Sequence, residues 1–267
     1  MSLITMPVYD TEENRRSSYT RESLRSLRQT VNPEKHTVYI VDNNSCKETK
    51  ELIRDFSSKF PAIIITNSDN LGPAGAVNKS WKFRKSNQHG VKIDNDVKIT
   101  QENWADDMEK ILSLDPRIGI LGLKRKVLPK ANENDIINLG EFTIERCNDV
   151  IGTCVMHSSN FLNKAGYLHG TGFYGYEDSL MCERSLIGGF YNAFYPKVDL
   201  EYLDPGDNIE YSQFKVKYAT SKAAEYIKLS TYYKNTRNIF YDPDKQFHIS
   251  PFINRKNFRP ARTTIKF

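Results

Sequence analysis

The stretch VKIDNDVKI, residues 91–99, places Asp94 and Asp96 one residue apart inside a run that reads as a β-strand. Successive side chains of a strand point to opposite faces, so the four charged residues are expected on one face and the four apolar residues on the other. A half-buried strand with a wet, charge-paired face has the same alternation. The stretch therefore indicates either an ordinary strand or a carboxylate pair with a function.

Strand-like and helix-like segments alternate around this stretch. Apolar and β-branched runs predict strands, and apolar residues at helical spacing predict helices. Strands are expected over residues 3–9, 36–42, 62–67 and 118–127, and helices over residues 18–31, 47–60, 72–86 and 99–114. Such alternation with short links predicts an α/β fold with a mostly parallel sheet, whose ligands bind beyond the carboxyl ends of the strands.

Polar residues collect at that edge of the predicted sheet. They are Tyr9, Asp10, Asp42, Asn70 and the pair Asp94 and Asp96. Asp42, in VDNNS, could accept hydrogen bonds from a ribose or a base, although an Asx-turn is an ordinary role for it. The glycines of NLGPAG let a ligand approach the backbone closely, but the segment matches neither GxGxxG nor GxxxxGK[ST], which excludes dinucleotide and P-loop sites.

A second acidic pair, Glu177 and Asp178, begins a helix-like run that stops at Gly188. Acidic residues in the first turn of a helix are favoured by its dipole, by about 0.3–1 kcal/mol. The preceding GTGFYGY is rich in glycine and aromatic residues, which capping alone does not explain. We therefore expect a shaped loop around a ligand.

Length and composition describe a globular chain. The 267 residues are 39% apolar and 27% charged, which suits a large domain with a buried core. No apolar run approaches a bilayer span, and the first ten residues lack the features of a signal peptide, so we expect cytoplasmic residence without membrane insertion. The four cysteines form no CxxC pair and the five histidines no HExxH, which excludes zinc-ribbon, dithiol redox and zincin motifs.

The formal charge of +5 is concentrated in residues 254–267. This segment has no acid and five basic residues: Arg255, Lys256, Arg259, Arg262 and Lys266. The rest of the chain has 33 basic and 33 acidic residues, so the whole excess of positive charge lies in this segment. Two phenylalanines lie among these charges, as in segments that meet phosphate backbones or anionic surfaces. A solvated chain end is the alternative interpretation.

Five segments resemble, in the same order, those of family 2 GT-A-type inverting glycosyltransferases. They are TMPVYD, YIVDNNSCKET, NLGPAGAVNKSW, IDNDV (the family's DxD motif) and GYEDSLMCERSLIGG, and they cover about residues 3–190. The resemblance implies a Rossmann-like GT-A sheet, mixed and mostly parallel, flanked by helices. It divides the chain into a catalytic domain over residues 1–200 and a C-terminal extension with a basic tail over residues 201–267. Residues 1–100 would form the nucleotide-sugar half and residues 101–200 the acceptor half.

The resemblance also assigns roles to residues. Those expected to hold or support the nucleotide sugar are Thr5, Pro7, Tyr9, Asp42, Asn70, Gly72, Asn78 and Asp94. Asp94 and Asp96 would hold Mn²⁺ or Mg²⁺, Asp178 would be the catalytic base, and Glu177 would contact the acceptor. Further acceptor contacts are expected from Trp104, although its helix turns it inward, and from Tyr174, Tyr176, Arg255, Lys256 and Arg259.

A third metal ligand is left open by this comparison. Tyr202 stands where many relatives of the family have a histidine. Asp204 or the more distant His248 could replace it, or the DxD residues could bind the metal with only donor phosphates and water.

The donor in this family is a nucleotide sugar, usually uridine-linked. Most members glycosylate polysaccharides, glycolipids or glycoproteins, which favours a glycan acceptor. The missing membrane anchor, the cluster KSWKFRK and the basic tail instead favour DNA with a hydroxymethylated pyrimidine, the acceptor of phage hydroxymethylcytosine glycosyltransferases. A third hypothesis is a non-catalytic nucleic-acid-binding protein on a degenerate GT-A fold.

Overall fold

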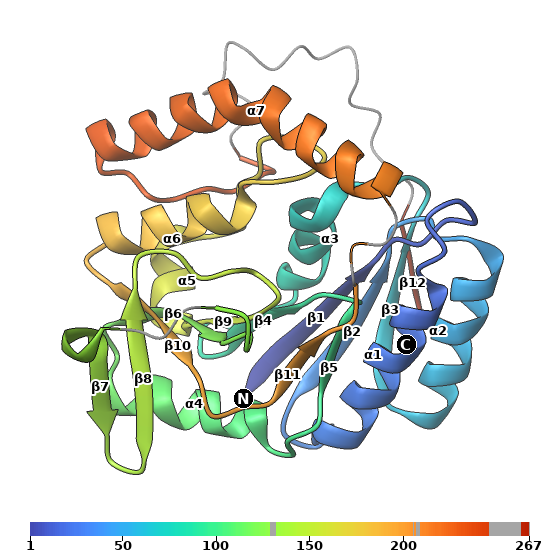
Figure 1. The fold of residues 1–267 in the computed structure, drawn as a ribbon, viewed down its shortest axis with the longest axis horizontal. Helices are drawn as coiled ribbons and strands as arrows, with labels where there is room; N and C mark the ends of the chain where they lie inside the picture. The colour runs from blue at the N-terminus through green and yellow to red at the C-terminus, as the bar shows by residue number, and fades with distance from the viewer. Residues whose placement is uncertain (129–131, 205, 207–208, 246–262, 267) are drawn as a thin grey trace.

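The computed structural model describes residues 1–128, 132–204, 206, 209–245 and 263–266. Its centre is a ten-stranded mixed sheet with the strand order β12-β3-β2-β1-β4-β9-β6-β10-β8-β7 (Figure 1). The strands are β1 (Ser2–Val8), β2 (Thr37–Asp42), β3 (Ala62–Asn67), β4 (His89–Ile93), β6 (Ile118–Leu123), β7 (Ile136–Leu139), β8 (Phe142–Cys147), β9 (Cys154–His157), β10 (Tyr191–Tyr195) and β12 (Thr263–Lys266). A separate two-stranded sheet pairs β5 (Val97–Ile99) with β11 (Leu200–Tyr202).

The central sheet is mostly parallel in its middle. Strands β3, β2, β1 and β4 run in one direction, and β6 pairs in parallel with β10. Strand β9 lies antiparallel between β4 and β6, so these two share one direction and their carboxyl ends lie at the same edge. This arrangement confirms the predicted mixed, mostly parallel α/β sheet.

Helices cover both faces of the sheet. They are α1 (Ser17–Thr30), α2 (Lys47–Lys59), α3 (Gly72–Trp81), α4 (Trp104–Leu114), α5 (Ser159–Ala165), α6 (Glu177–Ile187) and α7 (Ile209–Thr236), with a 3₁₀ turn at Glu133–Asp135. One core layer contains buried residues of α1, α2 and α4, and the other contains those of α3, α5 and α6. Burial of these two apolar layers is the main favourable term in the stability of such a fold.

The expected single strand over residues 91–99 is wrong. Strand β4 ends at Ile93, the residues 94–96 form a turn, and β5 begins at Val97 in the other sheet. The physical reason is Asn95, whose Nδ2 donates to Asp10 Oδ1 at 2.9 Å and to Thr20 Oγ1 at 2.7 Å. These bonds hold the turn against the end of β1 and the start of α1, so the alternation of faces does not continue through it.

Three other predicted elements are shorter than expected. The helix over residues 99–114 begins at Trp104, because Asn103 has the left-handed conformation with φ 60°. The helix over residues 72–86 ends at Trp81, and the strand over residues 118–127 ends at Leu123. The hairpin of β7 and β8, helix α7 and edge strand β12 were not predicted.

Helix α7 belongs to the expected C-terminal extension and crosses one end of the molecule above α6 and α3 in the view of Figure 1. His248 and the tail residues Arg255, Lys256 and Arg259 lie outside the described residues. Within the described part of the chain, no helix combines the length and apolar character that crossing a bilayer requires.

Candidate active site

The turn between β4 and β5 separates the two aspartates of the DxD motif. Asp94 follows β4 directly, and its backbone N–H donates to Thr153 O at 2.9 Å. Its carboxylate meets Lys92, whereas that of Asp96 meets Arg16, a residue at the start of α1. The motif therefore contributes to two adjoining clusters of charge.

The first cluster surrounds the ammonium group of Lys92. Its Nζ lies 2.8 Å from Gly152 O, 3.1 Å from Asp94 Oδ1 and 3.5 Å from Asp178 Oδ2. The Lys92 side chain is only 3% exposed, whereas those of Asp94 and Asp178 are 33% and 29% exposed. The two carboxylates can thus reach a ligand while the buried lysine holds them close together.

Asp178 is positioned by the first turn of α6 and by Gly152. A Cβ at residue 152 would lie 1.9 Å from Asp178 Oδ2, so only glycine leaves room for this carboxylate. Tyr176 precedes the helix in a left-handed conformation with φ 65°. Glu177, the other acid of the pair, is buried at 6% exposure.

Burial and mutual repulsion alter the protonation of this cluster. Burial, with a contribution from the charge of Asp178, raises the pKa of Glu177 to about 7. Burial also raises the pKa of Asp94, with Asp96 and Asp178 adding to the rise and Lys92 opposing it. Burial lowers the pKa of Lys92, but the surrounding carboxylates outweigh it and raise the pKa overall. Lys92 therefore keeps its positive charge at neutral pH.

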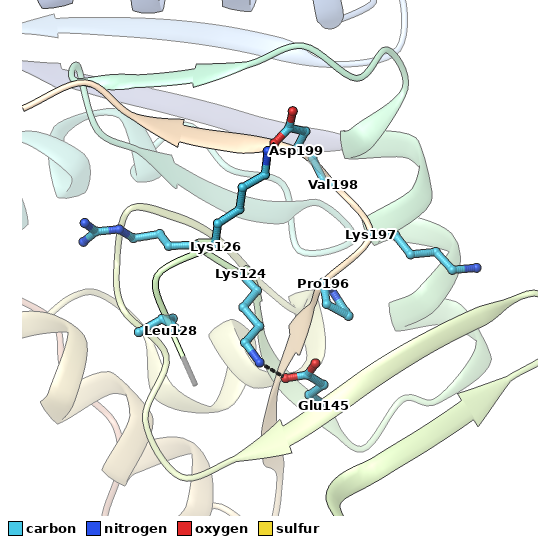
Figure 2. A pocket seen from close by; sticks show the side chains of 9 residues that line it. Lys124, Lys126, Leu128, Glu145, Pro196, Lys197, Val198 and Asp199 are labelled. Atoms are coloured by element: carbon cyan, nitrogen blue, oxygen red, sulfur yellow. Dashed lines mark hydrogen bonds and ion pairs between the residues drawn. The ribbon is translucent and has the colours of Figure 1, made fainter. Parts of the chain in front are cut away.

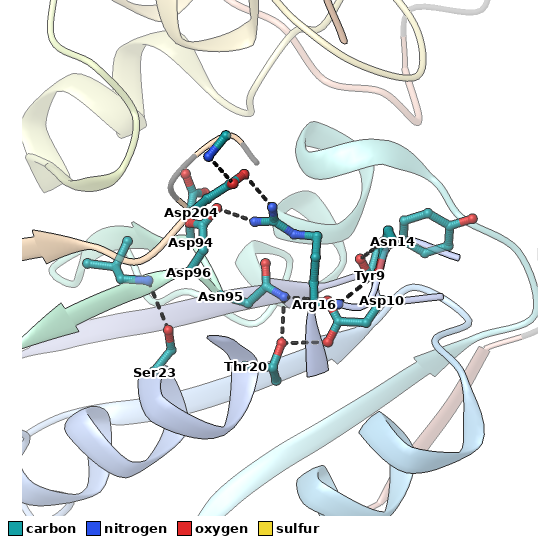
Figure 3. Close-up of polar contacts among 12 residues, drawn as sticks. Tyr9, Asp10, Asn14, Arg16, Thr20, Ser23, Asp94, Asn95, Asp96 and Asp204 are labelled. Carbon is teal, nitrogen blue, oxygen red and sulfur yellow. Dashed lines mark hydrogen bonds and ion pairs between the residues drawn. The ribbon is translucent and has the colours of Figure 1, made fainter. Parts of the chain in front are cut away.

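The second cluster, drawn in Figure 3, surrounds the guanidinium of Arg16. Its Nη2 donates to Asp96 Oδ2 and its Nη1 to Asp204 Oδ2. Lys215 of α7 reaches the same oxygen of Asp204, with its Nζ at 3.5 Å. The second oxygen of Asp96, Oδ1, is buried and has no hydrogen-bond partner among the described residues. A buried carboxylate oxygen without a partner in the chain can be satisfied by water or by a bound cation.

A hard divalent cation fits this oxygen chemistry. Mn²⁺ and Mg²⁺ take carboxylate and phosphate oxygens as ligands, and Asp96 has a buried oxygen available. The described residues include no group of three or more His, Cys, Asp or Glu side chains arranged to hold a metal. Further ligands would therefore come from a bound substrate or water.

Two of the candidates for a third metal ligand, Asp204 and Tyr202, lie in the described part of the chain. Asp204 pairs with the guanidinium of Arg16, which also pairs with Asp96. The ring of Tyr202 instead lies against Arg125, whose Cζ is 4.1 Å from the ring centroid. Burial and the charges of Asp96 and Asp204 raise the pKa of Tyr202, so its hydroxyl stays neutral. Asp204 is thus the better placed of the two.

Several residues expected at the nucleotide form turns at the edge of the sheet. Asp42 Oδ1 accepts from Ser45 N–H at 2.8 Å, and Asn70 Oδ1 accepts from Gly72 N–H at 2.8 Å. Gly72 has φ +71°, and a Cβ there would lie 2.2 Å from Phe173 O. These contacts shape the edge, and Asp42 also lines a hollow of about 250 Å³ beside α2 and β3.

Other expected nucleotide contacts lie deeper in the protein. Thr5 is fully buried and shares a 2.7 Å hydrogen bond with Ser80 Oγ, so its side chain belongs to the interior. Pro7 is buried within β1 opposite Val41. Asn78 exchanges two hydrogen bonds with the backbone of Leu168, at 2.8 and 3.0 Å, and supports the loop that precedes α6.

Tyr9 follows β1 at the same edge as Asp94 and is half-buried. Its carbonyl accepts from Asn14 Nδ2 at 3.4 Å (Figure 3). Among the residues expected at the nucleotide, Tyr9, Asn70 and Asp94 are partly exposed at the sheet edge, where Asp42 is 2% exposed.

The expected acceptor residues separate into core and loop positions. Trp104 is fully buried and donates from Nε1 to Thr30 Oγ1 at 3.2 Å, so it packs in the core instead of meeting an acceptor. Tyr176 stacks on Tyr226 of α7, with ring centroids 4.6 Å apart. Tyr174 lies half-buried in the same loop.

A basic hollow of about 300 Å³ lies at the carboxyl ends of β6 and β10 (Figure 2). Two of its lysines are already paired with acids, Lys124 with Glu145 and Lys126 with Asp199. The hollow includes neither Asp178 nor the residues of the turn 94–96.

Sequence reasoning missed Arg16, Lys92, Asn95 and Gly152 as site residues. The alternation of the predicted strand placed Lys92 on the same face as Asp94, but as part of a wet, charge-paired face and not as a buried partner of the acids. Nothing local marks Arg16, because its partner Asp204 is 188 residues away.

The mixed sheet, with an acidic turn at the carboxyl edge and an acidic helix start facing it, defines a protein of the GT-A class. The chain belongs to glycosyl transferase family 2, whose model matches residues 4–168. This match confirms the predicted family. No curated protein matches the chain by sequence.

Solved structures show the same fold. A mannosyltransferase from Pyrobaculum calidifontis, in complex with GDP-Man and Mn²⁺, is 15% identical with TM-score 0.62, covering 88% of this chain and 64% of its own. S. aureus TarS 1-349 with UDP is 17% identical with TM-score 0.57, covering 74% and 58%. GalNAc-T7 with UDP, GalNAc and Mn²⁺ is 14% identical with TM-score 0.60, covering 76% and 43%. The chain thus spans less than two thirds of the length of each.

Proposed function

We propose that the protein is an inverting, metal-dependent glycosyltransferase that moves a sugar from a nucleotide sugar to an acceptor hydroxyl. The observation that carries this proposal is the position of Asp94 and Asp178 on one buried ammonium group, that of Lys92. Asp94 comes from the proposed donor half, residues 1–100, and Asp178 from the proposed acceptor half, residues 101–200. A base for the acceptor and a carboxylate for the donor therefore face each other.

The proposed chemistry balances around Asp178. The acceptor hydroxyl gives its proton to the Asp178 carboxylate while its oxygen forms a bond to the anomeric carbon. The bond from that carbon to the phosphate oxygen breaks, and the nucleoside diphosphate leaves with the electron pair from the opposite side, so the configuration inverts. A divalent cation held by Asp96, with Asp94 and Asp204 nearby, would supply Lewis-acid stabilisation of the departing diphosphate.

Support for a nucleotide-sugar donor comes from the family and from the neighbours of the same fold, which were solved with GDP-Man and with UDP. We propose a uridine-linked donor, the usual one in the family. Asp42 and the residues of the adjoining turn would contact the nucleoside, because they lie at the sheet edge beside the acid turn.

For the acceptor we propose a hydroxyl group, with a hydroxymethylated base in DNA and a glycan as the two candidates. A gel shift with duplex DNA at low and high salt separates them. DNA binding that weakens as salt rises, together with sugar transfer to hydroxymethylated DNA, would establish the first candidate. Transfer to a glycan without a shift would establish the second.

The decisive experiment measures UDP release from a panel of UDP-sugars with Mn²⁺. Asp178→Asn should abolish release while UDP binding persists, and Asp96→Ala should weaken UDP·Mn²⁺ binding. Asp55→Asn, which removes an exposed carboxylate of α2 paired with Lys59 at 2.6 Å, is the matched control and should behave as wild type. Tight DNA binding without turnover of any nucleotide sugar would instead support the non-catalytic binder.

A further inference from the structure

Arg16 lies at the centre of the acid cluster on the α1 side of the turn. Its two terminal nitrogens join carboxylates from distant segments, Asp96 and Asp204, and all three side chains are at most 8% exposed. A buried cation between two buried carboxylates offsets charge repulsion that would otherwise be costly. The proposed function places the divalent cation at these same carboxylates.

We propose that Arg16 is a resident cation of this site: it neutralises Asp96 and Asp204 in the metal-free protein and must release at least one of them when a divalent ion binds. This inference rests on the proposed metal site. A guanidinium and a divalent ion a few ångströms apart repel each other, and burial weakens the screening of that repulsion. Arg16 and the metal therefore compete for the same two carboxylates, Asp96 and Asp204.

The surroundings of the two carboxylates make this exchange feasible. Asp96 keeps one buried oxygen, Oδ1, without a partner among the described residues, so a cation can begin to bind before Arg16 leaves. Asp204 has a second cationic neighbour in Lys215, 3.5 Å away. Release of Asp204 by Arg16 would therefore not leave that carboxylate isolated.

Competition has a defined sign in a binding measurement. The apparent metal affinity of the wild-type protein equals the intrinsic affinity multiplied by the fraction of molecules in which Arg16 has released the carboxylates. If Arg16 has released the carboxylates in roughly one wild-type molecule in ten, Arg16→Gln should bind Mn²⁺ about tenfold more tightly than wild type. Arg16→Lys keeps the charge but cannot bridge two carboxylates in the same way, so its affinity should lie between the two.

The experiment measures Mn²⁺ binding by electron paramagnetic resonance without nucleotide. The matched control is Arg21→Gln, because Arg21 is an exposed arginine of α1 paired with Glu48 at 3.2 Å, and its loss should leave Mn²⁺ affinity unchanged. Thermal unfolding in EDTA adds a second readout, in which Arg16→Gln should melt below wild type. An Mn²⁺ affinity of Arg16→Gln equal to or weaker than wild type would overturn the proposal, as would no Mn²⁺ binding by either protein.

A measurement on the wild-type protein covers the case in which Arg16→Gln does not fold. The arginine side-chain signals in ¹⁵N NMR spectra, assigned with Arg16→Lys, should shift for Arg16 when Mg²⁺ is added. Unchanged Arg16 signals at saturating Mg²⁺ would contradict release. Neither measurement involves sugar transfer, so tighter Mn²⁺ binding without turnover would refute the transferase and leave the resident cation standing.

Discussion

Lys92 forms an ion pair with Asp178, with its Nζ 3.5 Å from Asp178 Oδ2, and the Lys92 side chain is almost fully buried. The same ammonium group is 3.1 Å from Asp94 Oδ1. A single buried charge thus fixes the separation between two carboxylates that come from different halves of the chain. Their relative position therefore depends on a buried side chain of strand β4 and on the first turn of α6.

Lys92→Met should destabilise the protein strongly. Removing one partner of a buried ionic network typically costs about 3–5 kcal/mol, because the remaining carboxylates lose their counter-charge. The matched control is Lys98→Met, which removes an exposed ion pair with Glu201 and should cost less than about 1 kcal/mol. Urea denaturation measures both values. Equal losses for the two variants would show that Lys92 does not hold the acid cluster together.

Gly152→Ala should impair turnover more than nucleotide binding. The new methyl group would meet the Asp178 carboxylate at 1.9 Å and push it away from the acceptor position. We expect kcat to fall at least about tenfold, since small displacements of a catalytic group are costly, while UDP affinity stays close to wild type. Gly140→Ala is the control for backbone strain away from the site, because its φ is +61° and nothing lies within 4 Å of its added Cβ, so it should lower stability without lowering kcat. Unchanged kcat in Gly152→Ala would contradict the assignment of Asp178.

Asp115 should make stability depend on acid pH. Hydrogen bonds from Arg117, and one from Tyr191 OH at 2.8 Å, lower the pKa of Asp115 to about 2. A lowered folded-state pKa contributes stability that is complete above the ordinary pKa near 4 and is lost as the pH falls toward 2. Asp115→Asn should therefore cost about 2 kcal/mol at pH 7 and close to nothing at pH 2. Denaturation curves at both pH values test this, and a loss independent of pH would contradict it.

Asn95→Ala should loosen the acid turn without unfolding the protein. Its side-chain amide joins the turn to Asp10 and Thr20, and each lost hydrogen bond is worth about 1 kcal/mol. We expect weaker binding of UDP with Mn²⁺, because Asp94 and Asp96 on either side would no longer be held in place. Calorimetric titration measures this, and wild-type affinity in Asn95→Ala would show that the turn is held by other contacts.

The sequence predicted the parts of the fold that local periodicity encodes. Strand β3 over residues 62–67 and the start of α6 at Glu177 both appear where the apolar pattern and the acidic pair placed them. The turn at Asn95 was missed because its cause, the contact with Asp10 and Thr20, is not local. A strand pattern alone gives no sign that its middle residue is bound to another segment.

The acids of the candidate site were assigned from the sequence, whereas its cations were not. Asp94, Asp96 and Asp178 were assigned from motifs that resemble those of the family, and the structure brings Asp94 and Asp178 to the same lysine. Arg16 joins the site through tertiary contacts with Asp96 and Asp204, and Lys215 joins it through Asp204. For Trp104 the sequence analysis expected a contact with the acceptor, but the residue is fully buried in the core.

The most direct test of the central claim is a crystal structure with a uridine diphosphate sugar and Mn²⁺. The diphosphate should lie against the turn of residues 94–96, with the metal on Asp96 and the anomeric carbon facing the Asp178 carboxylate. A nucleotide bound away from this turn, or a sugar whose anomeric carbon points away from Asp178, would contradict the proposed transfer reaction.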